Sequence, residues 1–181
     1  MKLASYVGTR PGVMGLGNVL IRLRLGGAES HSEVVFEPGD GPEVAALMPD
    51  GSLEPDANGA LWCCSSVGLE RLPHWSKRRA GHLGGVRFKR IVLGKSWVLD
   101  TTQADPLRAA QWASANEGRL YDWQSIGRYL LWILPSKASR GMCSEVCATM
   151  LGAQEADAHL FDPRLLRAAV RMNAKFNQGG V

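Results

Sequence analysis

The residue whose type and position best suit catalysis is Cys143, which lies where an irregular stretch turns into a predicted helix. A helix N-terminus presents unpaired backbone N–H groups and the positive end of the helix macrodipole, so it favours a thiolate over a thiol. Lys137 and Arg140 lie nearby and favour the thiolate as well. We therefore predict that Cys143 is a nucleophile, the alternative being a buried structural cysteine.

A thiolate nucleophile needs a base, and His31 is the candidate. It lies in the segment 30–36 (SHSEVVF), whose composition predicts a strand. Alternate residues of a strand share a face, so the imidazole of His31 and the carboxylate of Glu33 are expected side by side. In this arrangement His31 accepts the proton of the thiol and later protonates the leaving group.

Glu33 is our first candidate for the group that orients His31. Its position two residues away on the same strand is not ideal for reaching the distal ring nitrogen. Ser65 or Ser66 on a neighbouring strand, or a backbone carbonyl, are the alternatives. Glu33 is equally suited to an ion pair with Arg87 or Lys89.

An oxyanion formed at this site needs hydrogen-bond donors. The backbone N–H of Cys143 or Ser144 is expected to supply one, and the hydroxyl of Tyr121 a second. Loss of such a donor typically slows the reaction by a factor of ~10²–10³. Glu145 falls in the first helical turn and is interpreted as a partner of the helix dipole, and Asp122 as the cap of a helix that begins at Trp123.

The first half of the chain is predicted to be rich in strands and the second half to be helical. Residues 15–25 fit either a helix or a strand, and we favour a helix. Residues 68–83 are polar and basic and are interpreted as a loop excursion. Strands are expected at 31–37, 43–48, 60–66, 84–93 and 97–99, and helices at about 105–117, 123–134, 144–152 and 163–172, with a fraying tail at 177–181.

Length and composition fit one α+β domain over residues 1–181, with a largely antiparallel sheet. The chain has 45% hydrophobic and 21% charged residues and a formal net charge of +4. Its basic residues form no long block, so a nucleic-acid partner is not expected. The sequence leaves the oligomeric state open.

No apolar run is long enough for a transmembrane segment, and no export signal is recognisable, which favours a cytoplasmic location. Without such a signal, the four cysteines are expected to be free thiols. Cys143 and Cys147 are four residues apart, but the histidines lie in no recognisable ligand spacing. We therefore expect neither a metal nor another cofactor.

Five short segments carry a resemblance to a known family. They occur in this order: 30–36 (SHSEVVF), 64–66 (CSS), 84–89 (GGVRFK), 116–123 (NEGRLYDW) and 143–145 (CSE). Their order and spacing resemble the permuted papain-like, NlpC-related cysteine hydrolases of the YiiX group, especially phage and prophage members. The histidine precedes the cysteine, which is the reverse of the papain order and is what a circular permutation would produce.

The resemblance implies a circularly permuted papain-like fold, with a mainly antiparallel sheet packed against helices and a Cys–His dyad between the two layers. It implies hydrolysis or transfer at an amide, ester or thioester carbonyl. One departure is the excursion 68–83, which separates two segments that normally follow each other closely, leaving open whether it forms a lid. Another is that the motif does not identify the third catalytic residue.

Three functions remain open at this stage. The first is a cysteine amidase or peptidase, with bacterial cell-wall peptide as the substrate that the resemblance suggests. Such an enzyme would reach the cell envelope by a phage lysis or tail-delivery route. The second is an acyltransferase or thioesterase acting on a lipid or ester, for which residues 15–25 are the candidate membrane-binding helix. The third is an inactive binding or phage-structural module.

Overall fold

The protein is built around a five-stranded sheet. The computed structural model describes residues 1–9, 12–122 and 140–178. The strands lie in the order β4-β3-β2-β1-β5, and all four neighbouring pairs are antiparallel. The expected α+β class with a mainly antiparallel sheet is confirmed. The strands are β1 (Lys2–Tyr6), β2 (His31–Phe36), β3 (Leu61–Arg71), β4 (Leu83–Ile91) and β5 (Trp97–Thr101).

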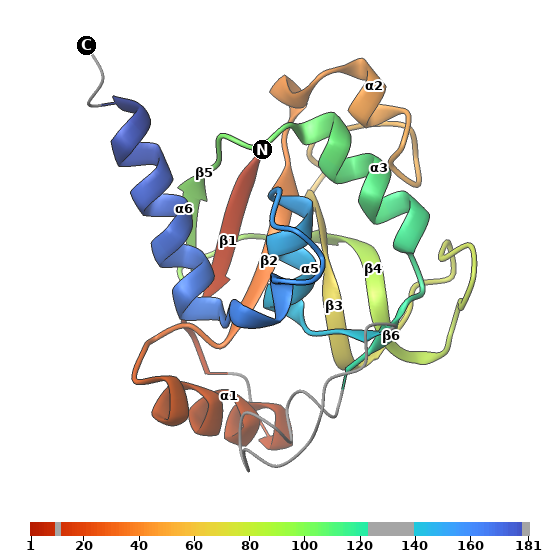
Figure 1. Cartoon of the computed structure of the whole chain (residues 1–181). Coiled ribbons are helices and arrows are strands. Elements are labelled where there is room, and N and C mark those ends of the chain that lie inside the picture. Colours follow the sequence, from red (N-terminus) through yellow and green to blue (C-terminus); the bar gives the residue numbers. More distant parts are fainter. Residues whose placement is uncertain (10–11, 123–139, 179–181) are drawn as a thin grey trace.

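Helices cover one face of this sheet. Figure 1 shows α5 in front of β2 and β3, with α3 toward β4 and α6 toward β5, while α1 lies at the end of the sheet where β2 begins. The helices are α1 (Gly12–Leu25), α2 (Pro42–Ala45), α3 (Pro106–Asn116), α5 (Cys143–Met150) and α6 (Pro163–Gln178). None of the helices in the described ranges is long and apolar enough to span a membrane.

The main core lies between the sheet and these helices. Alternate residues of β2, β3 and β4, including Val34, Cys64 and Phe88, pack with Val146 and Met150 of α5. A smaller apolar cluster of Ala4, Val35 and Cys63 lies on the opposite face. The period of two along each strand therefore separates the two faces, as the pattern of the sequence indicated. The main core holds α5 in a fixed place against β2 and β3.

Strand β1 was not predicted, although it lies between β2 and β5. Its five residues are mixed in character, and four of them are buried. Tyr6 pairs with His31 on one side and with Trp97 on the other. A short segment without clear alternation gives no strand signal by itself, because its pairing is decided by its two neighbours. β1 therefore determines which residues flank His31.

The strand expected at 43–48 is wrong. Residues Pro42–Ala45 form the short helix α2, which follows Gly41 and is preceded by a 3-10 turn at Pro38–Asp40. Gly41 has a φ of 101°, and proline at the first position of a helix has a suitable φ. Residues 38–42, which lie between the strands expected at 31–37 and 43–48, instead form the 3-10 turn and begin the helix.

The excursion expected at 68–83 is shorter than predicted, because β3 continues to Arg71 and β4 already begins at Leu83. The pairing is irregular between Val67 and Arg71. Gly84 has a φ of 72°, and a Cβ there would lie 2.7 Å from the carbonyl oxygen of Gly68. The connecting loop is therefore 72–82, and it leaves a close contact between the two strands.

The boundaries of the two C-terminal helices also differ from the prediction. Helix α6 continues to Gln178, so the expected end at 172 and fraying from 177 are corrected for the described part of the tail. Helix α5 begins at Cys143 rather than 144. The helix expected at 123–134 lies outside the described residues.

Candidate active site

Cys143 is the first residue of α5. The helix packs against β2 and β3, which brings its N-terminus to the end of the sheet where β2 begins. Met142 precedes it in extended conformation, and its N–H donates to Glu145 Oε2 at 2.8 Å. The backbone N–H groups of the first turn point out of this N-terminal end of the helix. Cys143 is only 5% exposed, so its thiol lies in a largely dry environment.

His31, the first residue of β2, hydrogen-bonds to the side chain of Cys143. Its Nε2 lies 2.8 Å from Oε1 of Glu33, so Nδ1 is the ring nitrogen left for the thiol. Burial by itself would lower the pKa of His31. The negative charge and hydrogen bond of Cys143, together with Glu33, outweigh burial and raise this pKa to about 9. The imidazolium form is therefore stabilised beside the sulfur.

Glu33 contacts both His31 and Arg87. Arg87 Nη1 donates to Glu33 Oε2 at 2.8 Å, and Nη2 donates to Oε1 at 2.7 Å. Burial raises the pKa of the Glu33 carboxyl, but the charge of Arg87 and the bonds to His31 and Arg87 lower it to about 2. The two contacts that the sequence suggested for Glu33, with His31 and with a basic residue of a neighbouring strand, thus occur together.

Arg87 is 1% exposed, although it is charged. Its Nη2 also lies 3.6 Å from Glu70, which in turn pairs with Lys89. Lys89, the other cation considered for Glu33, therefore pairs with Glu70. Since a bidentate guanidinium fixes the plane of a carboxylate, Arg87 fixes the carboxylate that holds Nε2 of His31. The side chains of Arg87, Glu33, His31 and Cys143 therefore contact one another in this order.

Tyr121 is brought near Cys143 by a second, two-stranded sheet. Strand β6 (Leu120–Tyr121) pairs in parallel with β7 (Arg140–Gly141), which immediately precedes Met142 and Cys143. Burial and the negative charges of Cys143, Glu145 and Asp122 raise the pKa of Tyr121 well above its usual value. The phenol therefore remains protonated at neutral pH, close to the sulfur.

The three serines considered for the site differ in their surroundings. Ser65 donates to the Ser32 carbonyl at 2.6 Å, while Nε2 of His31 contacts Glu33. Ser66 and Ser144 are fully buried, and among the described residues their hydroxyls have no hydrogen-bond partner. Ser144 is the second residue of α5, next to Cys143 at the N-terminus of the helix.

The aromatic residues that flank the imidazole were not predicted from the sequence. Trp97 of β5 lies edge-on to the His31 ring at a centroid distance of 6.2 Å, and Tyr6 of β1 contacts Trp97 at 5.0 Å. These three residues follow one another across β2, β1 and β5. These contacts could have been predicted only if residues 2–6 had been recognised as a strand between β2 and β5.

Burial raises the pKa of the other three cysteines, Cys63, Cys64 and Cys147, so these residues remain thiols at neutral pH. Cys147 Sγ lies 3.9 Å from Ser65 Oγ, next to the core. Within the described part of the chain, no group of three or more histidines, cysteines or acidic residues could hold a metal ion.

The helix expected to begin at Trp123 and the side chain of Lys137 lie outside the described residues. Asp122, its expected cap, is buried at 1% exposure. Within the described residues, 1–9, 12–122 and 140–178, the side chains of Cys143, His31 and Glu33 lie together, and Tyr121 lies near the thiol.

No family model, no curated protein and no solved structure matches this chain.

Proposed function

We propose that this protein is a cysteine hydrolase that cleaves an amide bond through an acyl-enzyme. The observation that carries the proposal is the position of His31, which contacts the side chain of Cys143 and has its other ring nitrogen 2.8 Å from Glu33. A nucleophile, a base and a group that orients the base are the elements that acyl transfer requires.

The reaction begins when Nδ1 of His31 takes the proton of the Cys143 thiol. The thiolate attacks the carbonyl carbon, and the oxyanion accepts hydrogen bonds from the backbone N–H of Cys143 or Ser144 and from the Tyr121 hydroxyl. The C–N bond then breaks as the imidazolium protonates the leaving amine. His31 next takes a proton from water, which attacks the thioester and releases the carboxylic acid, restoring the thiol.

Throughout this cycle the Glu33 carboxylate stabilises the imidazolium and holds its ring plane. A low pKa suits this role, because Glu33 must stay ionised while His31 gains and loses its proton. Arg87 supplies the positive charge that keeps the carboxylate ionised in a buried position. The residues of this chain thus account for each proton transfer in the reaction.

The finer assignment of fold and substrate rests on the sequence resemblance. A strand histidine that precedes a helix cysteine in the chain fits a permuted papain-like domain, and the five-stranded antiparallel sheet covered by helices is compatible with it. Bacterial cell-wall peptide is the substrate that the resemblance favours. A phage-encoded protein delivered to the cell envelope would meet this substrate.

The test combines thiol labelling with a substrate screen. Wild type, Cys143→Ala and His31→Gln are treated with iodoacetamide from pH 5 to 10, and the modified cysteine is identified by mass spectrometry. We expect Cys143 to react faster than Cys147 below neutral pH, and to slow at least about tenfold without His31. Cys147→Ala is the matched control, since it removes a cysteine from the same helix.

The same variants are then screened against peptide amides, including cell-wall peptides, and against esters and thioesters. Hydrolysis of an amide that is lost in Cys143→Ala but kept in Cys147→Ala would support the proposal. If Cys143 reacts no faster than the other three cysteines and no substrate is cleaved, the hydrolase assignment fails. The inactive binding module would then be the better description.

One observation favours acyl transfer on a lipid or ester as a second candidate. Helix α1 lies at the end of the sheet where β2 begins, and it exposes Leu20 at 44% and Leu23 at 75%. The helix contains no acidic residue, so it is compatible with an anionic lipid surface. Addition of liposomes to the substrate screen distinguishes this candidate, because only a lipid-acting enzyme should need them.

A further inference from the structure

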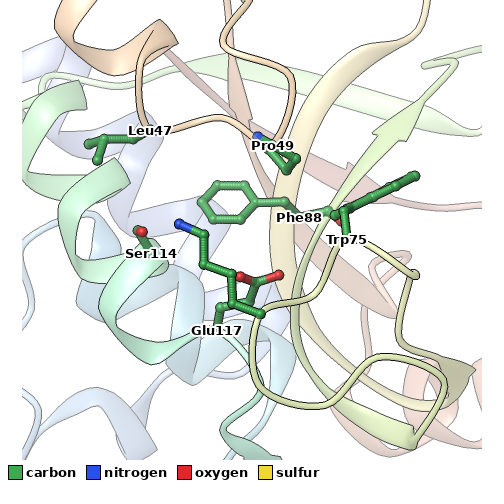
Figure 2. Close-up of a pocket in the computed structure, with 7 residues that line it drawn as sticks. Leu47, Pro49, Trp75, Phe88, Ser114 and Glu117 are labelled. Carbon is green, nitrogen blue, oxygen red and sulfur yellow. The ribbon is translucent and has the colours of Figure 1, made fainter.

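A pocket whose lining contains neither Cys143 nor His31 lies between α3, β4 and the loop 72–82. It has a volume of about 60 Å³. Figure 2 shows the Glu117 carboxylate below the Phe88 ring, with Ser114 on one side and Trp75 on the other. Lys77 also lines the pocket, and Leu47 and Pro49 complete its wall. None of these residues takes part in the proposed hydrolysis.

Glu117 is the residue that requires an explanation. It follows the last residue of α3, is only 3% exposed, and its Oε1 is buried without a hydrogen-bond partner among the described residues. A buried carboxylate normally has a charged or hydrogen-bonding partner, because removing it from water is costly. An oxygen of this kind in the wall of a pocket is therefore available to a cationic or hydrogen-bonding group of a ligand.

The remaining wall of the pocket suits a positively charged group beside Glu117. Trp75 and Phe88 present aromatic rings, which attract cations, and Ser114 adds a hydroxyl that can accept a hydrogen bond. Lys77 is an exposed cation in the same lining, and no ion pair joins it to Glu117 in the described structure. A simple amine would therefore meet repulsion from Lys77, whereas a ligand that also carries a negative charge would not.

The wall is also held in place. The indole N–H of Trp75 donates to the Phe88 carbonyl at 3.1 Å, and its ring lies edge-on to Trp62 at 5.7 Å. The loop closes on itself through hydrogen bonds from Gly81 N to the Leu72 carbonyl and from Arg71 to the Gly81 carbonyl. The pocket thus belongs to a defined part of the fold, and a ligand need not order it.

We propose that this pocket binds a small zwitterion of the amino-acid type, with its ammonium group on Glu117 and its carboxylate on Lys77. A volume of 60 Å³ accommodates roughly four or five water-sized atoms, which is the size of glycine. A ligand of this size binds weakly, with an expected dissociation constant on the order of 1 mM. The site is separate from the chemistry of Cys143 and does not depend on the proposed hydrolase activity.

The experiment follows the indole N–H signal of Trp75 by NMR in the whole protein, with the signal assigned through Trp75→Phe. The probes are glycine, ethylammonium and acetate at equal ionic strength. We expect glycine to move the signal saturably, ethylammonium to bind more weakly and acetate to have no effect. Glu117→Gln keeps the size of the side chain, and it should weaken glycine binding about tenfold or more.

Lys77→Met separates the two ends of the ligand. It should weaken glycine roughly two- to five-fold and strengthen ethylammonium, because the repulsive charge is gone. Lys95→Met, at an exposed lysine outside the pocket, is the matched control and should change neither. The proposal is overturned if glycine gives no saturable change, or if it binds Glu117→Gln as tightly as wild type. A response to ethylammonium alone would also overturn it.

Discussion

At the scale of single residues, the candidate site depends on four side chains that contact one another in sequence. Arg87 holds Glu33, Glu33 holds one nitrogen of His31, and His31 contacts Cys143. Arg87 and Glu33 are buried ions, and each compensates the charge of the other in the absence of water. A change at Arg87 or Glu33 should therefore alter the reactivity of the Cys143 sulfur.

Replacement of Glu33 by glutamine tests its electrostatic role. The amide keeps the size of the side chain but removes the charge that helps to raise the pKa of His31 to about 9. The alkaline limb of the pH–rate profile should therefore move to lower pH. The variant should also lose about 3–5 kcal/mol of unfolding free energy, because the buried Arg87 loses the carboxylate that it binds through two hydrogen bonds and keeps only Glu70 at 3.6 Å.

Glu70→Gln is the control for this experiment. Glu70 also faces Arg87, but at 3.6 Å and with a side chain that is 24% exposed. It should leave the alkaline limb unchanged and cost no more than about 1 kcal/mol in urea denaturation. If both variants keep the wild-type pH profile, Glu33 is a structural partner of Arg87 and does not act on His31.

Arg87→Lys tests whether the geometry of the guanidinium matters in addition to its charge. Lysine keeps the positive charge but cannot donate two parallel hydrogen bonds to Glu33. We expect a loss of about 1.5–3 kcal/mol in stability and a several-fold slower alkylation of Cys143. Arg90→Lys is the matched control on the same strand, where Arg90 pairs with Asp50. Equal alkylation rates in the two variants would contradict a positioning role for Arg87.

At the scale of elements, the N-terminus of α5 is the feature that places the thiol. Its first-turn residue Glu145 accepts a hydrogen bond from Met142 N and so caps the helix. The charge of Glu145 also lies near Tyr121, which in turn is close to Cys143. The cap and the charge can be separated, because glutamine fits the same position of a capping box.

Glu145→Gln should keep the stability of the protein and speed the alkylation of Cys143, because a negative charge near the thiolate is removed. Glu145→Ala should instead cost about 1 kcal/mol of unfolding free energy, since the cap is lost. Both quantities are measured on the same samples, by urea denaturation and by iodoacetamide kinetics. The prediction is wrong if glutamine destabilises the protein as much as alanine does.

The elements that the sequence predicted well are those with a strong local signal. Asp105 accepts hydrogen bonds from the N–H groups of Leu107 and Arg108, as expected for a cap in front of Pro106, and α3 begins there. β1 had no such signal, because only pairing with β2 and β5 defines it. The helical turn at Pro42–Ala45 was missed because the same proline and glycine residues also fit a turn between strands.

The same distinction applies to the candidate site. The alternation of His31 and Glu33 is a local property of one strand, and the expected neighbourhood of the two side chains is present. The contact with Arg87 depends on the register of β3 and β4, and the contact with Trp97 on β1. Register between distant strands is decided by the packing of the whole sheet, so the sequence offered Arg87 only as one of two partners.

At the level of the whole molecule, Glu33 makes stability depend on pH in the acid range, and His31 makes it depend on pH in the alkaline range. The pKa of Glu33 is lowered from 4.5 to about 2 in the folded state, so its contribution is present above 4.5 and is lost as the pH falls toward 2. The pKa of His31 is raised from 6.5 to about 9. Its contribution is present below 6.5 and is lost as the pH rises through 9.

Cys143→Ala should remove much of the alkaline loss while leaving the acid loss intact. The charge of Cys143 is the largest influence that raises the pKa of His31, and Glu33 keeps its partner Arg87 in this variant. Urea denaturation from pH 2 to 10 gives the free energy of unfolding on the acid limb and on the alkaline limb of its pH dependence. A single group contributes a slope of at most about 1.4 kcal/mol per pH unit to either limb. Cys147→Ala should lower stability at every pH without changing the alkaline limb, because its thiol is not the partner of His31. An unchanged alkaline limb in Cys143→Ala would mean that the imidazolium does not depend on the sulfur, and the thiolate–imidazolium pair would have to be abandoned.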